Sequence, residues 1–323
     1  MKRTCYQLQE NKRITAVSCQ NNLPHKDETR GEYWMEIASS SDEELSALLT
    51  ALDLHPLIIE DCLTLGYSTM IDRYETAVYF EFPITQYKSN NSRTTYLSLI
   101  YMSGLLITIR RGEILGGMES IAEALQRESI LYANDTLAVV YEIFSYFIAK
   151  DITAIRLLRD RVDEITHALE ESITAVEAET VSALHRHVSR LSDISEDRFY
   201  TLKSLLVLRS EPLQIDNDKP YIHNLVSDAE YGFRMLQRLE DRLRDLRTDF
   251  QLKTHDETEK RLRILTVISA VLLPLTLISG IFGMNFDNMD FLHWQYGYSL
   301  IMMAMGLIVV VMMIYFRHHG WFD

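Results

Sequence analysis

Two long apolar segments without charged residues lie near the C-terminal end of the chain, at Ile264–Phe282 and Ser299–Phe316. Each is close to the roughly 20 residues that a helix needs to cross the hydrocarbon core of a membrane. A helix in a soluble core is seldom so apolar on every face. The pattern therefore predicts two membrane-spanning helices, and the short connection between them predicts an antiparallel hairpin.

A heptad-like pattern precedes the first apolar segment. The chain from Tyr221 contains no proline until Pro274, so one helix can continue from Tyr221 to Phe282, over roughly 90 Å. Apolar or small residues recur along it at alternating steps of four and three, at positions 225, 229, 232, 236, 239, 243, 246 and 250. Such a seam has to pack, either against the preceding helices or against copies of itself.

The same helix face changes character as it enters the apolar segment. It reads Thr254, Thr258, Leu262, Leu265, Ser269, Leu273, Thr276 and Gly280. In one interpretation each hydroxyl bonds to the carbonyl four residues earlier and is merely tolerated in lipid. In the other, the face from Thr258 to Gly280 lines a narrow path for water and ions. Two spans cannot enclose a pore, so this second interpretation requires a ring of subunits.

The pattern in the rest of the sequence predicts an α+β domain, with a mixed sheet and flanking helices, followed by long helices. Ser41-Asp42-Glu43-Glu44 is a capping box that opens a helix, and Ala77–Tyr87, Thr94–Met102 and Leu105–Arg110 are typical of strands. Residues 135–209 contain no proline or glycine, which favours two long antiparallel helices. The predicted divisions are 1–130 (α/β domain), 131–219 (helix pair), 220–263 (stalk helix), 264–285 (first span), 286–298 (external loop), 299–316 (second span) and 317–323 (tail).

The net charge of −14 lies almost entirely before Ile264. A surface so acidic repels nucleic acid and attracts cations. Cys5, Cys19 and Cys62 are odd in number and lack a C-x-x-C spacing, so we expect a reduced cytosolic domain rather than a disulfide framework. The first ten residues contain no apolar stretch typical of a cleavable signal.

Basic residues near the two spans predict the orientation of the hairpin. Lys253, Lys260, Arg261 and Arg263 precede the first span, and Arg317 follows the second, whereas the connecting loop has no Lys or Arg. By the positive-inside rule both termini are cytoplasmic. We expect a plasma membrane location, which is the inner membrane in a Gram-negative cell.

Several short motifs of this chain occur together in one known family. They are Pro274-Leu275-Thr276, Gly283-Met284-Asn285, Tyr296-Gly297-Tyr298, Phe316-Arg317 with Trp321, and His55-Pro56-Leu57. With them the chain resembles the CorA family of divalent-cation channels. The resemblance is most specific over about sixty C-terminal residues and is weaker but collinear elsewhere.

The resemblance implies a homopentamer in a lipid bilayer, with a funnel-shaped cytosolic part and first spans that line the pore. Gly283, Met284 and Asn285 would form the selectivity entrance, and Asp287 and Asp290 would concentrate cations outside it. The expected activity is passive uptake of hydrated Mg²⁺, with Co²⁺ and Ni²⁺ as further candidates. No enzymatic activity and no cofactor are expected; Mg²⁺ is the transported ion.

The resemblance also implies closure of the pore when cytosolic Mg²⁺ bridges neighbouring subunits through carboxylates. Glu60 and Asp61 match one side of that site. The other side falls on Asn224, where the family usually has Asp, and Asp228 at i+4 can replace the missing carboxylate. Alternatively, Asp61 only caps a helix or faces water.

The sequence departs from the family's usual pattern at two places and leaves two alternative functions open. Phe291 replaces the family's usual loop Glu, and Arg317-His318-His319 replaces a run of lysines. One alternative function is a Zn²⁺ transporter of the ZntB type. The other is a membrane sensor or scaffold that transports nothing. An enzyme has little support, since there is no triad, P-loop or HExxH motif.

Overall fold

The structure is a computed structural model of the whole chain. The residues that it describes are 2–19, 32–39, 41–64, 71–88, 91–111, 117–128, 131–133, 135–172, 176–207, 218–284 and 296–321. The chain divides into two compact units, one made of Met1–Glu171 with Ala175–Leu246 and the other of Ser172–Thr174 with Arg247–Asp323.

The first unit is built on a seven-stranded sheet with the order β2-β1-β3-β7-β6-β5-β4. All neighbouring strands are antiparallel except β3 and β7, which pair in parallel. The strands are β1 (Lys2–Leu8), β2 (Ile14–Val17), β3 (Tyr33–Ser39), β4 (Ile71–Arg73), β5 (Ala77–Lys88), β6 (Asn91–Met102) and β7 (Leu105–Arg111). This is the mixed sheet that the sequence predicts.

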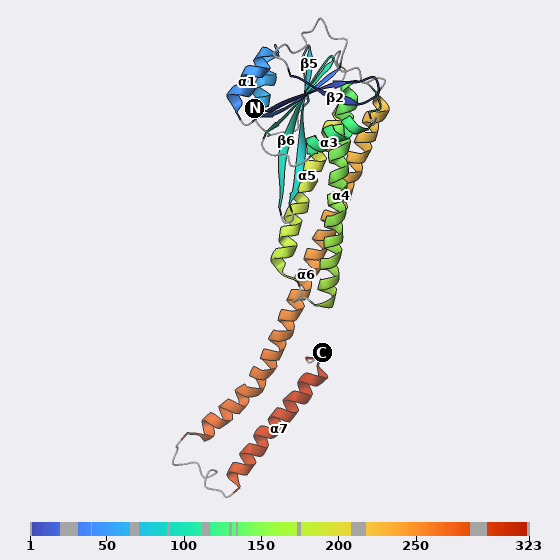
Figure 1. Ribbon diagram of the computed structural model, residues 1–323. Coiled ribbons are helices and arrows are strands. Elements are labelled where there is room, and N and C mark those ends of the chain that lie inside the picture. Colours follow the sequence, from blue (N-terminus) through green and yellow to red (C-terminus); the bar gives the residue numbers. More distant parts are fainter. Residues whose placement is uncertain are drawn as a thin grey trace. The chain divides into compact units, whose positions relative to one another are not determined.

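Alternating side chains of the strands enter two separate cores, because successive residues of a strand point to opposite faces. Trp34, Phe80 and Phe82 belong to one core, and Met35, Ile37 and Tyr79 to the other. The first face is covered by helices α3 (Gly117–Arg127), α4 (Thr136–Glu171), α5 (Ala178–Val207) and α6 (Lys219–Phe282). The second face is covered by α1 (Asp42–Ala51) and α2 (Pro56–Leu63), as Figure 1 shows.

Local sequence explains where these helices begin. The Ser41 hydroxyl accepts a hydrogen bond from the Glu44 amide, as the capping box predicts. Pro56 stands in the first turn of α2, where its missing amide proton is not needed, and the His55 ring caps that turn by accepting from the Leu57 amide.

The heptad seam of α6 packs against the preceding helix pair, which decides between the two alternatives that the sequence left open. Its residues are buried from Leu225 to Leu246. A Cβ added at Gly232 would lie 3.7 Å from Ile152 of α4, and the ring of Phe233 lies 6.2 Å from that of Phe199 of α5. Because Gly232 has no side chain, α4 and α6 can approach each other closely at this point of the seam.

In the part of the chain that the structure describes, two helices are long and apolar enough to cross a membrane, α6 and α7 (Gly297–His318). Only 6% of the most apolar window of each is buried. Within the second unit the last part of α6 and α7 run in opposite directions (Figure 1). Since water cannot stabilise so much exposed apolar surface, these helices need lipid or other copies of the chain around them. The helix expected from Tyr221 to Phe282 is continuous, with Pro274 inside it.

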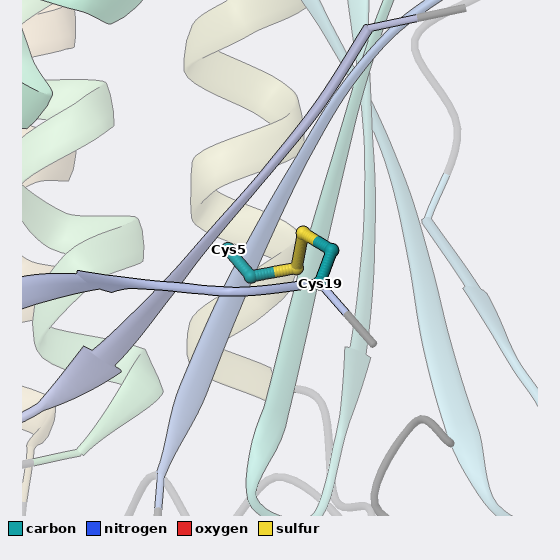
Figure 2. The surroundings of a disulfide bond; sticks show 2 residues. All are labelled: Cys5 and Cys19. Carbon is teal, nitrogen blue, oxygen red and sulfur yellow. A yellow bond between two sulfur atoms is a disulfide. The ribbon is translucent and has the colours of Figure 1, made fainter. Parts of the chain in front are cut away.

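The prediction of reduced cysteines is wrong for two of the three. Cys5 and Cys19 form a disulfide with a Cα–Cα distance of 5.5 Å (Figure 2). The antiparallel register of β1 and β2 places Cys5 opposite Val17, so the chain just after β2 passes beside Cys5. Residue spacing alone does not reveal this pairing, because it depends on the hairpin register. Cys62 lies buried in the core beneath α1 and α2 and is not part of the disulfide.

We expect reduction of the Cys5–Cys19 disulfide to destabilise the first unit. It closes a loop with a sequence separation of 14, and a loop of that size contributes about 3 kcal/mol by restricting the unfolded chain. Dithiothreitol should therefore lower the midpoint of thermal unfolding of the detergent-solubilised protein, followed by near-UV circular dichroism. The Cys5→Ser/Cys19→Ser double variant should unfold at the lower midpoint with or without reductant. An unchanged midpoint in the wild-type protein would contradict a stabilising role.

Candidate ion pathway and cation-sensing residues

The predicted pore-lining face of α6 is exposed along its whole length in the single chain. All seven residues lie on the surface: Thr258, Leu262, Leu265, Ser269, Leu273, Thr276 and Gly280. Val267, which lies on nearly the opposite side of the helix at 100° per residue, is buried with 5% exposure. The stripe therefore points away from the side on which α6 packs within its own unit.

The hydroxyl groups of the stripe are satisfied by the helix itself. The hydroxyls of Thr258, Ser269 and Thr276 donate to the carbonyls four residues earlier at 2.9, 2.8 and 2.8 Å. This bonding makes the residues tolerable in lipid. It also uses the only proton of each hydroxyl, so the group presents acceptor lone pairs to whatever lies beside the helix. Such a surface suits a cation whose bound waters donate hydrogen bonds.

Two glycines at the end of this helix, Gly280 inside it and Gly283 just after it, differ in their local surroundings. A Cβ added at Gly280 would meet no atom of another described side chain or segment within 4 Å, so none of the described neighbours requires a small residue there. A Cβ added at Gly283 would lie 2.9 Å from the Ser279 carbonyl oxygen, which is too close for a side chain. Gly283 follows the last helical residue, and its amide donates to that same carbonyl at 2.9 Å. The end of α6 therefore depends on glycine at position 283.

Part of the predicted entrance lies outside the described residues. The structure describes Gly283 and Met284, the latter exposed, but not Asn285, Asp287, Asp290 or Phe291.

Glu60 and Asp61 lie near the end of α2 on its outer side. Glu60 is exposed and Asp61 is half-buried, whereas Ile58 and Cys62 of the same helix enter the core. The Asp61 carboxylate accepts a hydrogen bond from the Tyr74 hydroxyl at 3.3 Å. Asp61 thus has a partner within the chain, but this single bond leaves acceptor positions of its carboxylate for a cation.

Asp72 and Tyr74 surround the Asp61 carboxylate with further polar groups. Burial, with a smaller contribution from Asp61, raises the pKa of Tyr74 to about 12 and also raises the pKa of Asp72. The phenol is therefore protonated at neutral pH and donates to Asp61. Neither residue can be predicted from the sequence, because they approach Asp61 only through the position of β4 and the turn after it, which no local motif reveals.

Asn224 and Asp228 lie one turn apart on α6 and contact each other. The Asn224 side-chain amide donates to Asp228 at 3.3 Å and to the Tyr141 hydroxyl at 3.2 Å. These two bonds direct the amide protons inward and leave the Asn224 carbonyl oxygen as an acceptor on an exposed residue. Partial burial raises the pKa of Asp228.

The two halves of the predicted regulatory site lie on opposite sides of the sheet. The helix that carries Glu60 and Asp61 packs on one core through Ile58, and the start of α6 packs on the other through Ile222 and Leu225. One chain therefore does not bring these halves together. A site that combines them requires two chains.

The histidines of the tail are close to the end of α7. The His319 Nδ1 lies 2.9 Å from the Tyr315 carbonyl oxygen, and the rings of these two residues are tilted at 31° with their centroids 4.2 Å apart. The His318 and His319 ring centroids lie 5.7 Å apart. The His319 ring is thus held against its own helix.

Comparison with known proteins gives relatives over nearly the whole chain. The "Cobalt/magnesium transport protein CorA" of Thermotoga maritima is 24% identical over 325 residues, covering 98% of this chain and 90% of the relative. The complete structure of the CorA magnesium transporter from Methanocaldococcus jannaschii superposes with a TM-score of 0.81 at 16% identity, over 99% of each chain. The ZntB cytoplasmic domain from Vibrio parahaemolyticus has a TM-score of 0.63 at 12% identity and covers 79% of this chain and 98% of that one.

The two structural similarities concern the fold, since their identities are low. A family model described as "CorA-like Mg2+ transporter protein" matches residues 30–318, most of the chain. With a mixed-sheet domain, a long helix that continues into an apolar span, and a second apolar helix, the chain belongs to the CorA-like Mg²⁺ transporter family.

Proposed function

We propose that the protein is a homopentameric channel for passive uptake of hydrated Mg²⁺, with both termini in the cytoplasm. The observation that carries the proposal is the exposed stripe of α6 from Thr258 to Gly280, whose hydroxyls offer only acceptors. The stripe spans 22 residue steps, about 33 Å of helix, and its part within the apolar segment, from Leu265 to Gly280, covers about 22 Å, which is most of a hydrocarbon core. Five copies facing a common axis would give a continuous path.

The chemistry of this path suits a hydrated ion. Mg²⁺ releases its waters reluctantly, so a pore that keeps them avoids a large desolvation cost. The hydroxyls of Ser269 and Thr276 and the amide oxygens of a ring of Asn285 can accept hydrogen bonds from those waters. The leucines between them bind nothing, which keeps the ion moving, because conduction needs weak sites.

The membrane potential is a sufficient driving force for such uptake. Moving a divalent cation through 100 mV releases about 4.6 kcal/mol, which corresponds to a concentration ratio of roughly a thousand or more. No nucleotide-binding motif is present in the sequence to supply another source of energy. Passive flow is therefore the simplest mechanism consistent with this chain.

Regulation by cytosolic Mg²⁺ would use the sites on α2 and α6. Glu60 and Asp61 of one subunit would share an ion with Asn224 and Asp228 of a neighbour. The placement of the two pairs on opposite sides of the sheet supports a site between chains rather than within one. Asn224 would contribute its carbonyl oxygen, but it carries no charge, so we expect weaker binding than with a fourth carboxylate.

Ion flux into proteoliposomes tests the transport function. Purified protein should carry Mg²⁺ inward under a negative internal potential, and Asn285→Ala should reduce the rate by at least about ten-fold, because the neutral amide ring is lost. Asn288→Ala in the same loop serves as the matched control and should retain the wild-type rate.

The same assay distinguishes the competing functions. Preference for Zn²⁺ over Mg²⁺ would favour a transporter of the ZntB type, and an absence of flux for Mg²⁺, Zn²⁺ and Co²⁺ would favour a sensor or scaffold. Normal Mg²⁺ flux through Asn285→Ala would contradict the proposed entrance.

Substitution of Gly283 tests the geometry at the end of α6. Gly283→Ala places a Cβ 2.9 Å from the Ser279 carbonyl oxygen, so the helix end must shift and carry Met284 with it. We expect Mg²⁺ flux to fall by about ten-fold or more, since small displacements of positioned groups have large effects. Gly306→Ala on α7, whose added Cβ meets no atom within 4 Å of the chain, should leave flux unchanged. Equal Mg²⁺ flux in the two variants would contradict the prediction that ion entry depends on glycine at position 283.

Restoring a carboxylate at position 224 should strengthen regulation. In Asn224→Asp we expect the internal Mg²⁺ concentration that halves flux to fall by roughly ten-fold, equivalent to about 1.4 kcal/mol of added binding. Gln237→Glu adds the same charge at another exposed position of α6 and should have no effect. If both variants shift equally, the effect arises from overall charge and not from a site at Asn224.

A further inference from the structure

Three metal-ligating side chains meet on the segment of α6 that precedes its apolar part. His255, Asp256 and Glu259 are all exposed, and a ligand atom from each lies within 4.8 Å of the other two. The residues take no part in the predicted pore stripe or in the predicted regulatory site.

The contacts of these side chains leave them available for a ligand. Among the described residues the side chains of His255 and Asp256 make no hydrogen bond or ion pair. The Glu259 carboxylate has one, to Arg263 at 3.9 Å, which is long for a salt bridge and engages one oxygen. His255 and Glu259 are four residues apart, so they project from the same side of the helix and can hold one ion between them.

We propose that His255, Asp256 and Glu259 form a binding site for a divalent transition-metal ion, of the class of Zn²⁺, Co²⁺ and Ni²⁺. One imidazole and two carboxylates are three good ligands for these ions and leave positions for water. Ligand atoms about 2.1 Å from a common ion lie roughly 3 to 3.5 Å from each other. The three ligand atoms already lie within 4.8 Å of one another, so modest side-chain rotation would bring them to this separation without movement of the helix.

The charges around the site indicate why it would prefer these ions to Mg²⁺. Lys253, Lys260, Arg261 and Arg263 are close to the three ligands in the sequence and offset the carboxylates of Asp256, Glu257 and Glu259, so the local field attracts a hydrated cation only weakly. Binding must come from direct coordination, and the imidazole nitrogen favours transition metals over Mg²⁺, which prefers an all-oxygen shell. The site thus differs in kind from the carboxylate site proposed for Mg²⁺ sensing.

The position of the site would place a bound metal near the ion path, an inference that rests on the proposed function. At 100° per residue His255 projects within about 20° of Leu262 and of Gly280 on the helical wheel. In a channel lined by this face, a metal held by His255 would stand beside the inner end of the path.

Cobalt titration of the purified full-length protein in detergent, with a large excess of Mg²⁺ present, tests the site. Coordinated Co²⁺ has visible absorption bands that report the ligand set, and any Co²⁺ bound to a thiolate is recognised by its near-ultraviolet charge-transfer band. We expect one saturable site per chain. His255→Ala and Glu259→Gln should each weaken it at least ten-fold, while circular dichroism stays unchanged because both residues are exposed.

Two controls separate this site from other histidines. His167→Ala removes an exposed helical histidine that lies 3.3 Å from the Glu170 carboxylate, and it should leave the titration unchanged. His318→Ala/His319→Ala removes the histidines of the tail and should also leave it unchanged. The proposal is overturned if the wild-type protein shows no saturable Co²⁺ band, if His255→Ala binds as tightly as wild type, or if the tail variant abolishes binding. The readout is equilibrium binding, so it stands whether or not ion flux is observed.

Discussion

The fold depends on one helix that satisfies its own backbone hydrogen bonds in three different surroundings. Helix α6 begins in the core beneath the sheet, continues beside α4 and α5, and ends as an apolar span. A helix bonds every internal amide to a carbonyl of the same segment, so it needs no partner when the environment changes from protein to lipid. What changes along α6 is only the outer surface, from Leu225 and Leu243 that pack internally to Leu273 that faces outward.

This continuity places the residues proposed for cation sensing and the apolar span in one element. The helix has 64 residues, which corresponds to about 96 Å, and Pro274 is the only proline inside it after the first turn. Asn224 and Asp228 lie near its start, whereas Ser269 and Thr276 lie within the apolar span. A change in packing at the start would need no hinge or linker to reach the span.

The parts predicted well from the sequence are those set by local periodicity. The seam from Leu225 to Leu246, the Ser41 cap and the two apolar spans follow from spacing that can be read without knowing the fold. What could not be predicted depends on which strands lie side by side. The order of the sheet brings Tyr74 to Asp61, and the register of β1 and β2 joins Cys5 to Cys19. The same topology separates α2 from α6, which sequence spacing does not disclose.

The self-bonded hydroxyls of α6 have a further consequence for ion discrimination. The hydroxyls of Thr258, Ser269 and Thr276 already donate their protons to backbone carbonyls of the helix, and the leucine side chains between them have no hydrogen-bond donor. An anion such as chloride is solvated by groups that donate protons, and this wall supplies only oxygen lone pairs. If this stripe lines the pore, as proposed, it would reject anions without a fixed negative charge on its surface and would hold the permitted cation only weakly.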